Sequence, residues 1–348
     1  MAARRSSNNE MDALPDTRRA LVVAPPVLLA ELARGATVSG SVLAERLGVT
    51  RAAIWKQVER LRESGLAVSA QTGGGYRLDA PLDLLDATQI QAGLRTDERA
   101  RLGGIAVHWQ LDSTSSELLR RVAHDPRDHL ACVTEIQSHG RGRRGRSWQT
   151  PLGGGIALSL LKRFDGGIAS LAGLSLVAGV AAVQALADCG IGEVGLKWPN
   201  DLVARGAKLG GILVELGGDS MGPCHAVIGI GINVRVDAVR GVAIDQPWID
   251  LATLAGGALP ARNRLVARLL ARCIDAFDRF ADVGFVAFAE AYAQHDVLRG
   301  RQVCVLRADT TQHGIARGVD TRGALRVAFA DGERVVDSGE VSIRADGA

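Results

Sequence analysis

The stretch 194-VGLKWPNDLVARGAKLGGILVEL-216 decides the fold class of this 348-residue chain. Its aliphatic residues come in runs of strand length. Pro199, Asn200 and Asp201 predict an irregular corner, and Arg205 with Gly206 predicts the turn of a hairpin. Strands joined by so short a loop are antiparallel, because parallel strands need a long crossover. We therefore predict an α+β domain with a mixed or largely antiparallel sheet, and not a doubly wound Rossmann fold.

The hairpin belongs to a central unit, residues 81–294, that mixes strands with helices. Residues 81–103 are amphipathic and predict a connector helix at its start. From residue 295 to 348 the sequence alternates polar and apolar positions between short turns, which predicts a small SH3-like β-barrel. Further strands are expected at 105–111, 130–137, 155–164 and 224–236, and helices at 115–124, 169–190 and 262–281.

A separate unit, residues 25–80, reads as a winged helix-turn-helix. Gly48 ends one helix and Thr50 is a good N-cap for the next. The second helix then has one apolar stripe of Ile54, Val58 and Leu61, with its cations largely off that stripe. A helix of this kind enters a DNA major groove in many regulators, although a winged helix can also serve only for protein contacts or as a lid.

Composition limits the possible functions. Lys and Arg number 41 against 38 Asp and Glu, so the net charge is only +3 and any basic function must be local. Five cysteines lie far apart without a CxxC pair, which favours a reducing cytoplasm over a disulfide framework or zinc site. No apolar run reaches the ~20 residues of a membrane span. Residues 1–24 are expected to be a disordered tail.

The most basic stretch is 139-HGRGRRGRSWQTP-151, in which glycines separate four arginines. Glycines let backbone N–H groups point at an anion, and arginines supply forked donors for phosphate oxygens. Trp148 offers a flat face on which a base could stack. A solvated basic loop beside a core tryptophan is an equally good explanation, since arginine is the main cation of this chain.

Three further clusters carry polar side chains at the ends of predicted strands. Lysine is rare here, with four in all, and two of them, Lys197 and Lys208, lie on the hairpin. They could neutralise a phosphate or carboxylate, or be surface charge beside a turn. The glycines of 229-GIGIN-233 allow close approach of a ligand. The hydroxyls of 112-DSTSSE-117 could bind a ligand or merely cap a helix.

Taken in order, these four clusters resemble the bifunctional biotin–protein ligases that also repress a biotin operon. The resemblance covers nearly the whole chain from about residue 25. It implies that ATP activates biotin to biotinyl-5′-AMP, with Mg²⁺ assisting, and that biotin then passes to a lysine of an acceptor. That acceptor is typically the biotin carboxyl carrier domain of acetyl-CoA carboxylase. The resemblance also implies operator DNA as a partner and biotinyl-5′-AMP as the co-repressor.

By position, the resemblance implies a role for each residue of the clusters. Lys208 and Arg143 are the expected catalytic residues, and Asp201 is the expected Mg²⁺ ligand. One departure is Ser115, where the family often has asparagine. The expected biotin contacts are Ser113, Thr114, Ser115, Gln137, Arg141, Gly142, Arg143, Lys208 and Gly211. The expected ATP and adenylate contacts are Arg144, Arg146, Trp148, Lys197, Asn200, Asp201 and Asn233. The expected DNA contacts are Arg51, Ala52, Trp55 and Lys56.

Linkage connects the two functions: if the loop that orders over the adenylate also supports a homodimer, the ligand brings two winged helices to two half-sites.

Three alternatives stay open. A lipoate–protein ligase shares the chemistry and a related fold. A transcription factor that only senses biotin or its adenylate would not need Lys208 and the arginine loop. The third is a ligase whose winged helix does not bind DNA, and it stays open because Trp55 is bulky for a recognition helix.

Overall fold

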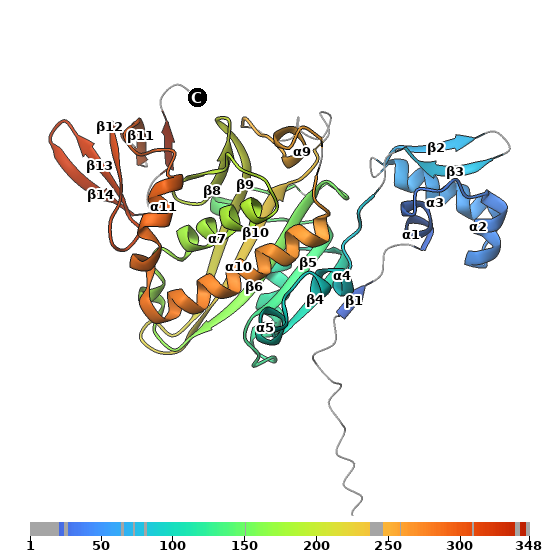
Figure 1. The fold of residues 1–348 in the computed structure, drawn as a ribbon, viewed down its shortest axis with the longest axis horizontal. Helices are drawn as coiled ribbons and strands as arrows, with labels where there is room; N and C mark the ends of the chain where they lie inside the picture. The colour runs from blue at the N-terminus through green and yellow to red at the C-terminus, as the bar shows by residue number, and fades with distance from the viewer. Residues whose placement is uncertain are drawn as a thin grey trace, which may run out of the picture.

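The structure is a computed structural model in which a central sheet domain lies between a winged helix and a small β domain (Figure 1). The description covers residues 21–23, 27–63, 66–71, 74–79, 82–149, 151–236, 246–257, 259–307, 310–337 and 342–345.

The central domain is built on an eight-stranded mixed sheet, as predicted. β1, β4 and β5 are parallel to one another, and all other neighbours are antiparallel. Ala204 pairs with Ala207 across the expected turn, in which Arg205 and Gly206 have φ of 51° and 79°. Two positive φ angles are typical of a type I′ hairpin. The strand order is β1 (Leu21–Val23), β4 (Gly104–Leu111), β5 (Leu130–Gln137), β6 (Gly155–Phe164), β10 (Cys224–Asn233), β9 (Ala207–Gly218), β8 (Asp201–Ala204) and β7 (Gly195–Lys197).

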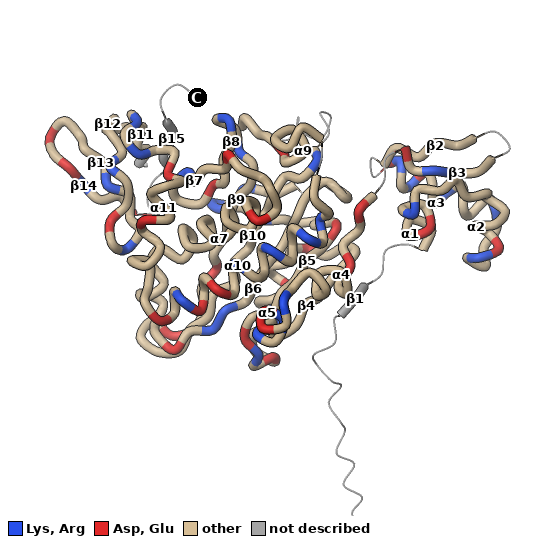
Figure 2. The backbone as a smooth tube through the Cα atoms, in the orientation of Figure 1, with Lys and Arg blue, Asp and Glu red and all other residues tan. Residues whose placement is uncertain are grey.

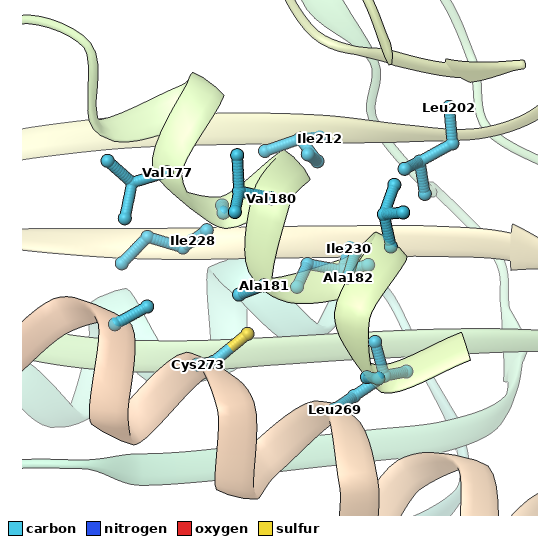
Figure 3. Packing of buried hydrophobic residues seen from close by; sticks show 14 of the residues in the cluster. Val177, Val180, Ala181, Ala182, Leu202, Ile212, Ile228, Ile230, Leu269 and Cys273 are labelled. Atoms are coloured by element: carbon cyan, nitrogen blue, oxygen red, sulfur yellow. The ribbon is translucent and has the colours of Figure 1, made fainter. Parts of the chain in front are cut away.

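Helices cover both faces of this sheet. α7 (Leu174–Asp188), which follows the 3₁₀ turn η2 (Ile168–Leu171), and α10 (Arg262–Val283) pack on one face (Figure 3). α6 (Thr114–Val122) packs on the other face through Leu118. The expected helices 115–124, 169–190 and 262–281 are thus confirmed, with the second one interrupted at Gly173, whose φ is 85°.

The residues Ile168–Asp188 qualify as a membrane span by length and composition, with a mean hydropathy of 1.9. The expectation that no apolar run reaches this length was therefore wrong. However, 61% of the 18-residue apolar window within this segment is buried inside the fold. An all-round apolar helix is also what the centre of a large core requires, and α7 occupies that place.

Two boundary predictions need correction. Leu21–Val23 form β1, parallel to Ala106–His108 of β4. The predicted disordered tail of residues 1–24 therefore extends too far along the chain. Residues 1–20 and 24–26 lie outside the described residues. The connector 81–103 is two short helices, α4 (Ala87–Ala92) and α5 (Thr96–Arg101), and not one. Gly93 separates them and lies so close to α10 that a Cβ there would be 2.8 Å from the Ala267 methyl.

The winged helix is confirmed. The Thr50 hydroxyl caps the second helix of the helix-turn-helix, Arg51–Glu63, by accepting the Ala53 N–H at 3.2 Å. Ile54, Val58 and Leu61 are the buried residues of this helix. Gly48 ends the preceding helix in the left-handed conformation. The elements are α1 (Val27–Ala33), α2 (Gly40–Leu47), α3 (Arg51–Glu63), and the wing strands β2 (Val68–Gln71) and β3 (Gly75–Leu78).

The C-terminal unit is an antiparallel β domain, as predicted. It follows η3 (Phe285–Phe288) and α11 (Ala289–His295), and it docks on the central domain where the Trp198 indole N–H donates to the Gly323 carbonyl at 3.0 Å. Closure of its sheet into an SH3-like barrel stays a prediction. The strand order is β14 (Gly332–Val336), β13 (Leu325–Phe329), β12 (Thr310–Val319), β11 (Gln302–Arg307) and β15 (Ser342–Ala345).

Candidate active site

One cavity of about 950 Å³ brings the four polar clusters together. Every residue expected to contact biotin or ATP lines it, although these residues come from six separate parts of the sheet domain. They lie at the end of β5 and the start of α6, on the glycine–arginine loop, at the β7–β8 corner, on β9 and at the end of β10. The strand ends that carry them meet because β5, β6, β10, β9 and β8 are neighbours in one sheet.

A buried hydroxyl cluster forms one wall of the cavity. Ser113, Thr114 and Ser115 are each at most 4% exposed. Ser113 occupies the N-cap position of α6 but makes no side-chain cap bond, so capping does not explain its hydroxyl. Thr114 and Ser115 each bond Ser159 Oγ, at 2.7 and 2.9 Å. Gln137 Oε1 accepts the Thr114 N–H at 2.9 Å, which joins β5 to this cluster.

The glycine–arginine loop forms a small closed hairpin over the cavity. Gly142 N–H donates to the Arg146 carbonyl at 2.7 Å, and Trp148 N–H donates to the Gly140 carbonyl at 2.8 Å. Its tip is the 3₁₀ turn η1 (Arg143–Gly145), where Arg144 has φ of 57°. Arg141 lines the cavity and also pairs with Glu215 at 2.9 Å.

Arg143 is the half-buried arginine of this loop. Its Nη1 donates to Asn200 Oδ1 at 3.3 Å, so the loop touches the β7–β8 corner directly. Burial, and next the neighbouring Arg144, lower the pKa of the Arg143 guanidinium. A cation that is disfavoured by desolvation would be stabilised by an anion arriving in the cavity.

Lys208 and Asp201 form an ion pair across the hairpin at 2.7 Å. Their side chains are only 19% and 23% exposed, so neither is free surface charge. Gly211 lies beneath the pair, since a Cβ there would be 3.4 Å from Lys208 Cε. The Lys208 backbone is fixed by residues 247–249, with its N–H donating to the Pro247 carbonyl and its carbonyl accepting the Ile249 N–H, each at 2.9 Å.

Asn200 holds the corner in shape. Its side-chain Nδ2 donates to the Ile212 carbonyl at 2.8 Å, and its backbone carbonyl accepts the Ile212 N–H at 2.9 Å. These bonds explain an asparagine at the corner without any ligand. The predicted contact of Asn200 with ATP remains a prediction.

Asn233 is the last residue of β10, and Trp148 of the glycine–arginine loop packs against the end of this strand. A Cβ on Gly231 would be 2.4 Å from Trp148 Cε2, so this glycine allows the indole to lie against the strand. The close approach predicted for 229-GIGIN-233 is therefore made by protein side chains, with Ser115 facing Gly229. Asn233 is buried and donates to the Ile249 carbonyl at 3.2 Å, which ties the strand end to α9 (Leu251–Leu254) and its preceding segment.

The lining of the cavity is strongly basic. Eight Lys and Arg residues line it against two carboxylates, Glu193 and Asp201. Basic segments are visible at the β7 and β8 end of the sheet (Figure 2). Such an excess of positive charge suits a ligand with several negative charges.

Sequence reasoning missed several lining or supporting residues. Ser159 is fully buried in an aliphatic strand, and its isolated polarity within 155-GIALSLLKRF-164 was the available signal. Nothing in the sequence indicates that the cavity is also lined by Gln246, Pro247 and Trp248, because these residues come close to Lys208 only in the folded protein. Arg301, from the segment that begins the β domain, also lines the cavity.

Within the part of the chain that the structure describes, one group of metal-type donors lies close together: Asp128, His129 and Asp278. The Lys162 ammonium already lies among them, 2.6 Å from Asp128 and 2.8 Å from Asp278. None of the three lines the cavity, so this group does not supply the expected Mg²⁺. Near the cavity, Asp201 is the carboxylate that fits, although Lys208 already bonds one of its oxygens.

The residues expected to contact DNA lie together on α3. Arg51, Ala52, Trp55 and Lys56 are all exposed, and Trp55 is 54% exposed although it is a large apolar side chain. Their contact with DNA remains a prediction.

Comparisons with known proteins agree with this site. Sequence profiles match for the Biotin/lipoate A/B protein ligase family at residues 108–233, for an HTH domain at 27–77, and for the Biotin protein ligase C terminal domain at 299–344. The Bifunctional ligase/repressor BirA of Salmonella typhimurium is 39% identical over 92% of this chain and 98% of its own length. The chain belongs to the bifunctional biotin ligase/repressor family.

Other members of the biotin ligases show the same relationship. The Biotin--[acetyl-CoA-carboxylase] ligase of Mycobacterium tuberculosis is 32% identical over 67% of this chain and 86% of its own length. The biotin protein ligase of Aquifex aeolicus, solved in complex with biotin and ATP, is 26% identical with a TM-score of 0.59, over 69% of this chain and 98% of that one. The predicted family, fold class and enzyme class are thus confirmed.

Proposed function

We propose that this protein uses ATP to convert biotin to biotinyl-5′-AMP and pyrophosphate, and then transfers biotin to a lysine of a carrier protein. The observation that carries the proposal is the single cavity in which the hydroxyl cluster, the arginine loop and the Lys208–Asp201 pair meet. It has a polar buried end for a small neutral head group and a basic end for phosphates.

The chemistry requires charge neutralisation more than a nucleophile. A biotin carboxylate must attack an α-phosphate, so two anions approach each other. Lys208 and Arg143, with the other loop arginines, offset that repulsion. The loop shields the hydrolysis-prone adenylate from water, and the acceptor lysine is the nucleophile of the second step.

Mg²⁺ would contribute positive charge to the phosphates when bound. Magnesium usually keeps several waters and is held by one or two carboxylates with substrate phosphates. Asp201 supplies such a carboxylate, with Lys197 and Asn200 beside it at the same corner.

The buried hydroxyl cluster favours biotin over lipoate. The biotin ureido ring carries N–H donors and a carbonyl, which Thr114, Ser115, Ser159 and Gln137 can pair with. The dithiolane of lipoate has no such groups, so it would cover this polar wall without forming any of these hydrogen bonds, and sites built to hydrogen-bond their substrate reject such analogues strongly. We therefore expect pyrophosphate release with ATP and biotin but not with ATP and lipoate. Equal turnover of lipoate would contradict the assignment.

The acceptor is the biotin carboxyl carrier domain of acetyl-CoA carboxylase, which the name of the Mycobacterium tuberculosis relative supports. Its lysine must reach the adenylate through the cavity mouth. A cytoplasmic location is part of the proposal, and the acceptor and the free cysteines support it.

The winged helix represses transcription when the adenylate accumulates. Residues Arg51, Ala52, Trp55 and Lys56 of α3 enter the major groove, and two copies of the chain bind a palindromic operator as an adenylate-bound homodimer. Unused adenylate then reports that acceptor protein is scarce.

Biotin with Mg·ATP should tighten binding to DNA from upstream of the biotin-synthesis genes by about 10-fold or more, within the usual range of allosteric coupling. Titration of labelled DNA, followed by fluorescence anisotropy, measures this change. Lys56→Ala should weaken binding with and without ligand, while Arg34→Ala serves as the control, because Arg34 is an exposed cation in the turn just after α1. Equal affinity with and without biotin and ATP would exclude the co-repressor role.

A further inference from the structure

A buried charged network joins the linker of the winged helix to the strands that carry the biotin end of the cavity. Its centre is Arg262, the first residue of α10, paired with Glu135 of β5. Both side chains are at most 4% exposed, and neither lines the cavity. The chemistry described above does not use them.

Arg262 bonds three segments that are far apart in the sequence. Its Nη1 donates to Glu135 Oε2 at 2.9 Å and to the Asp83 carbonyl at 2.7 Å. Its Nη2 donates to the Gly155 carbonyl at 2.7 Å. The planar guanidinium thus holds the linker, β5 and the first residue of β6 at once through two nitrogens in a fixed fork, a geometry that the single nitrogen of an ammonium does not reproduce.

The linker is fixed to the same network by its own backbone. Leu85 N–H donates to Glu135 Oε1 at 2.6 Å. Asp86 N–H donates to Asn263 Oδ1 at 2.8 Å, and Asn263 Nδ2 donates to the Leu84 carbonyl at 2.9 Å. The short peptide that leaves the winged helix is therefore bonded along its backbone to the central domain, with Leu85 buried there.

From this network two strands lead directly to the cavity. Glu135 and Gln137 are two residues apart in β5, and each bonds a different helix: Glu135 pairs with Arg262 of α10, and Gln137 accepts the Thr114 N–H at the start of α6. Gly155 pairs with Asn233 in the sheet, and Ala157 further along β6 lines the cavity.

The network also leads to the winged helix. Leu82 and Leu84 of the linker pack against the hydrophobic core of the winged helix, as does Ile136, which lies between Glu135 and Gln137. Leu152, just after the glycine–arginine loop, is a buried member of that same core. A Cβ on the adjacent Gly153 would be 2.2 Å from Leu82 Cδ1, so loop exit and linker are in direct contact.

We propose that Arg262 and Glu135 are positioning residues for biotin that also fix the linker, so that biotin binding and the placement of the winged helix depend on one ion pair. This inference rests on the proposed biotin site and adds a route within a single chain, separate from dimer formation. Ligand at Gln137 stabilises β5, β5 holds Glu135, and Glu135 with Arg262 holds the linker.

The test is Arg262→Lys in the full-length protein, which keeps the charge beside Glu135 but loses the forked bonds. We expect biotin binding, measured by calorimetry, to weaken by about 10- to 100-fold, as small displacements in a site can do. The KM for ATP should stay close to the wild-type value. Arg272→Lys is the matched control, because that arginine pairs with Asp188 at 2.7 Å on the exposed side of the same helix.

Hydrogen exchange gives a readout that a purely structural role would not change. In the wild type, biotin should slow exchange of the Leu85 and Asp86 amides, and in Arg262→Lys this slowing should be lost. Glu135→Gln, which keeps an acceptor for Leu85, is the second variant if the first does not fold. Wild-type biotin affinity in a folded Arg262→Lys variant, or unchanged slowing of the linker amides, would overturn the proposal. Absence of biotin binding by the wild type would instead refute the proposed function.

Discussion

Lys208→Ala is expected to release pyrophosphate from biotin and ATP about 100- to 1,000-fold more slowly than the wild type, the usual loss when one preorganised electrostatic contact is removed. The ammonium lies at the cavity with Gly211 beneath it and is bonded to Asp201 at 2.7 Å. Without it, the carboxylate and the α-phosphate would meet with one less positive charge between them. A coupled pyrophosphate assay at saturating biotin measures the rate.

The fold should survive this change. The Lys208–Asp201 pair is mostly but not fully buried, so its loss should lower the free energy of unfolding by an amount between the about 1 kcal/mol of an exposed pair and the about 3 to 5 kcal/mol of a fully buried one. The variant should therefore unfold at a lower temperature but still be folded in the assay. The control is Lys162→Met, which removes a buried lysine that does not line the cavity; it should lower stability and leave turnover per folded molecule unchanged. Wild-type pyrophosphate release by Lys208→Ala would refute the assigned role.

Gly231→Ala should raise the KM for ATP by about 5- to 150-fold, the range that corresponds to losing one base–aromatic stacking contact. The added methyl would lie 2.4 Å from Trp148 Cε2. Strand β10 is held between β6 and β9, so the indole must move and cannot present the same face to adenine. Steady-state kinetics with varied ATP measures this change.

Gly192→Ala is the matched control, since a Cβ at Gly192 would have no atom within 4 Å and its φ is not positive. The KM for biotin should change much less than that for ATP in Gly231→Ala, because the hydroxyl cluster at the other end of the cavity is not touched. An unchanged KM for ATP would show that Trp148 does not stack on the nucleotide.

Features with local causes could be predicted from the sequence. The turn at Arg205 and Gly206 follows from a glycine, which tolerates positive φ, between two aliphatic runs, and the turn alone excluded an all-parallel sheet. The apolar stripe of α3 and the cap at Thr50 are local in the same sense. The split of the connector had a visible signal in Gly93, but its cause is the contact with Ala267 on a helix distant in sequence.

Features that depend on distant pairing could not be predicted. The three residues of β1 have no pattern of their own, and they form a strand only because β4 offers an edge. Arg262 and Glu135 are 127 residues apart, and nothing in either segment indicates the other. The site residues were found because the resemblance assigned them, and the structure adds Ser159 and Arg301 to the same region.

The central claim is tested most directly by transfer of biotin to an acceptor. The purified protein is incubated with biotin, Mg·ATP and a biotin carboxyl carrier domain, with lipoate in place of biotin and Lys208→Ala in place of the wild type as controls. In an incubation just long enough for the wild type to go to completion, mass spectrometry of the carrier domain should show one added biotinyl group on a single lysine with the wild type and biotin, no lipoyl group with lipoate, and about 1% modification or less with Lys208→Ala. An unmodified carrier domain, or equal modification by lipoate, would contradict the account.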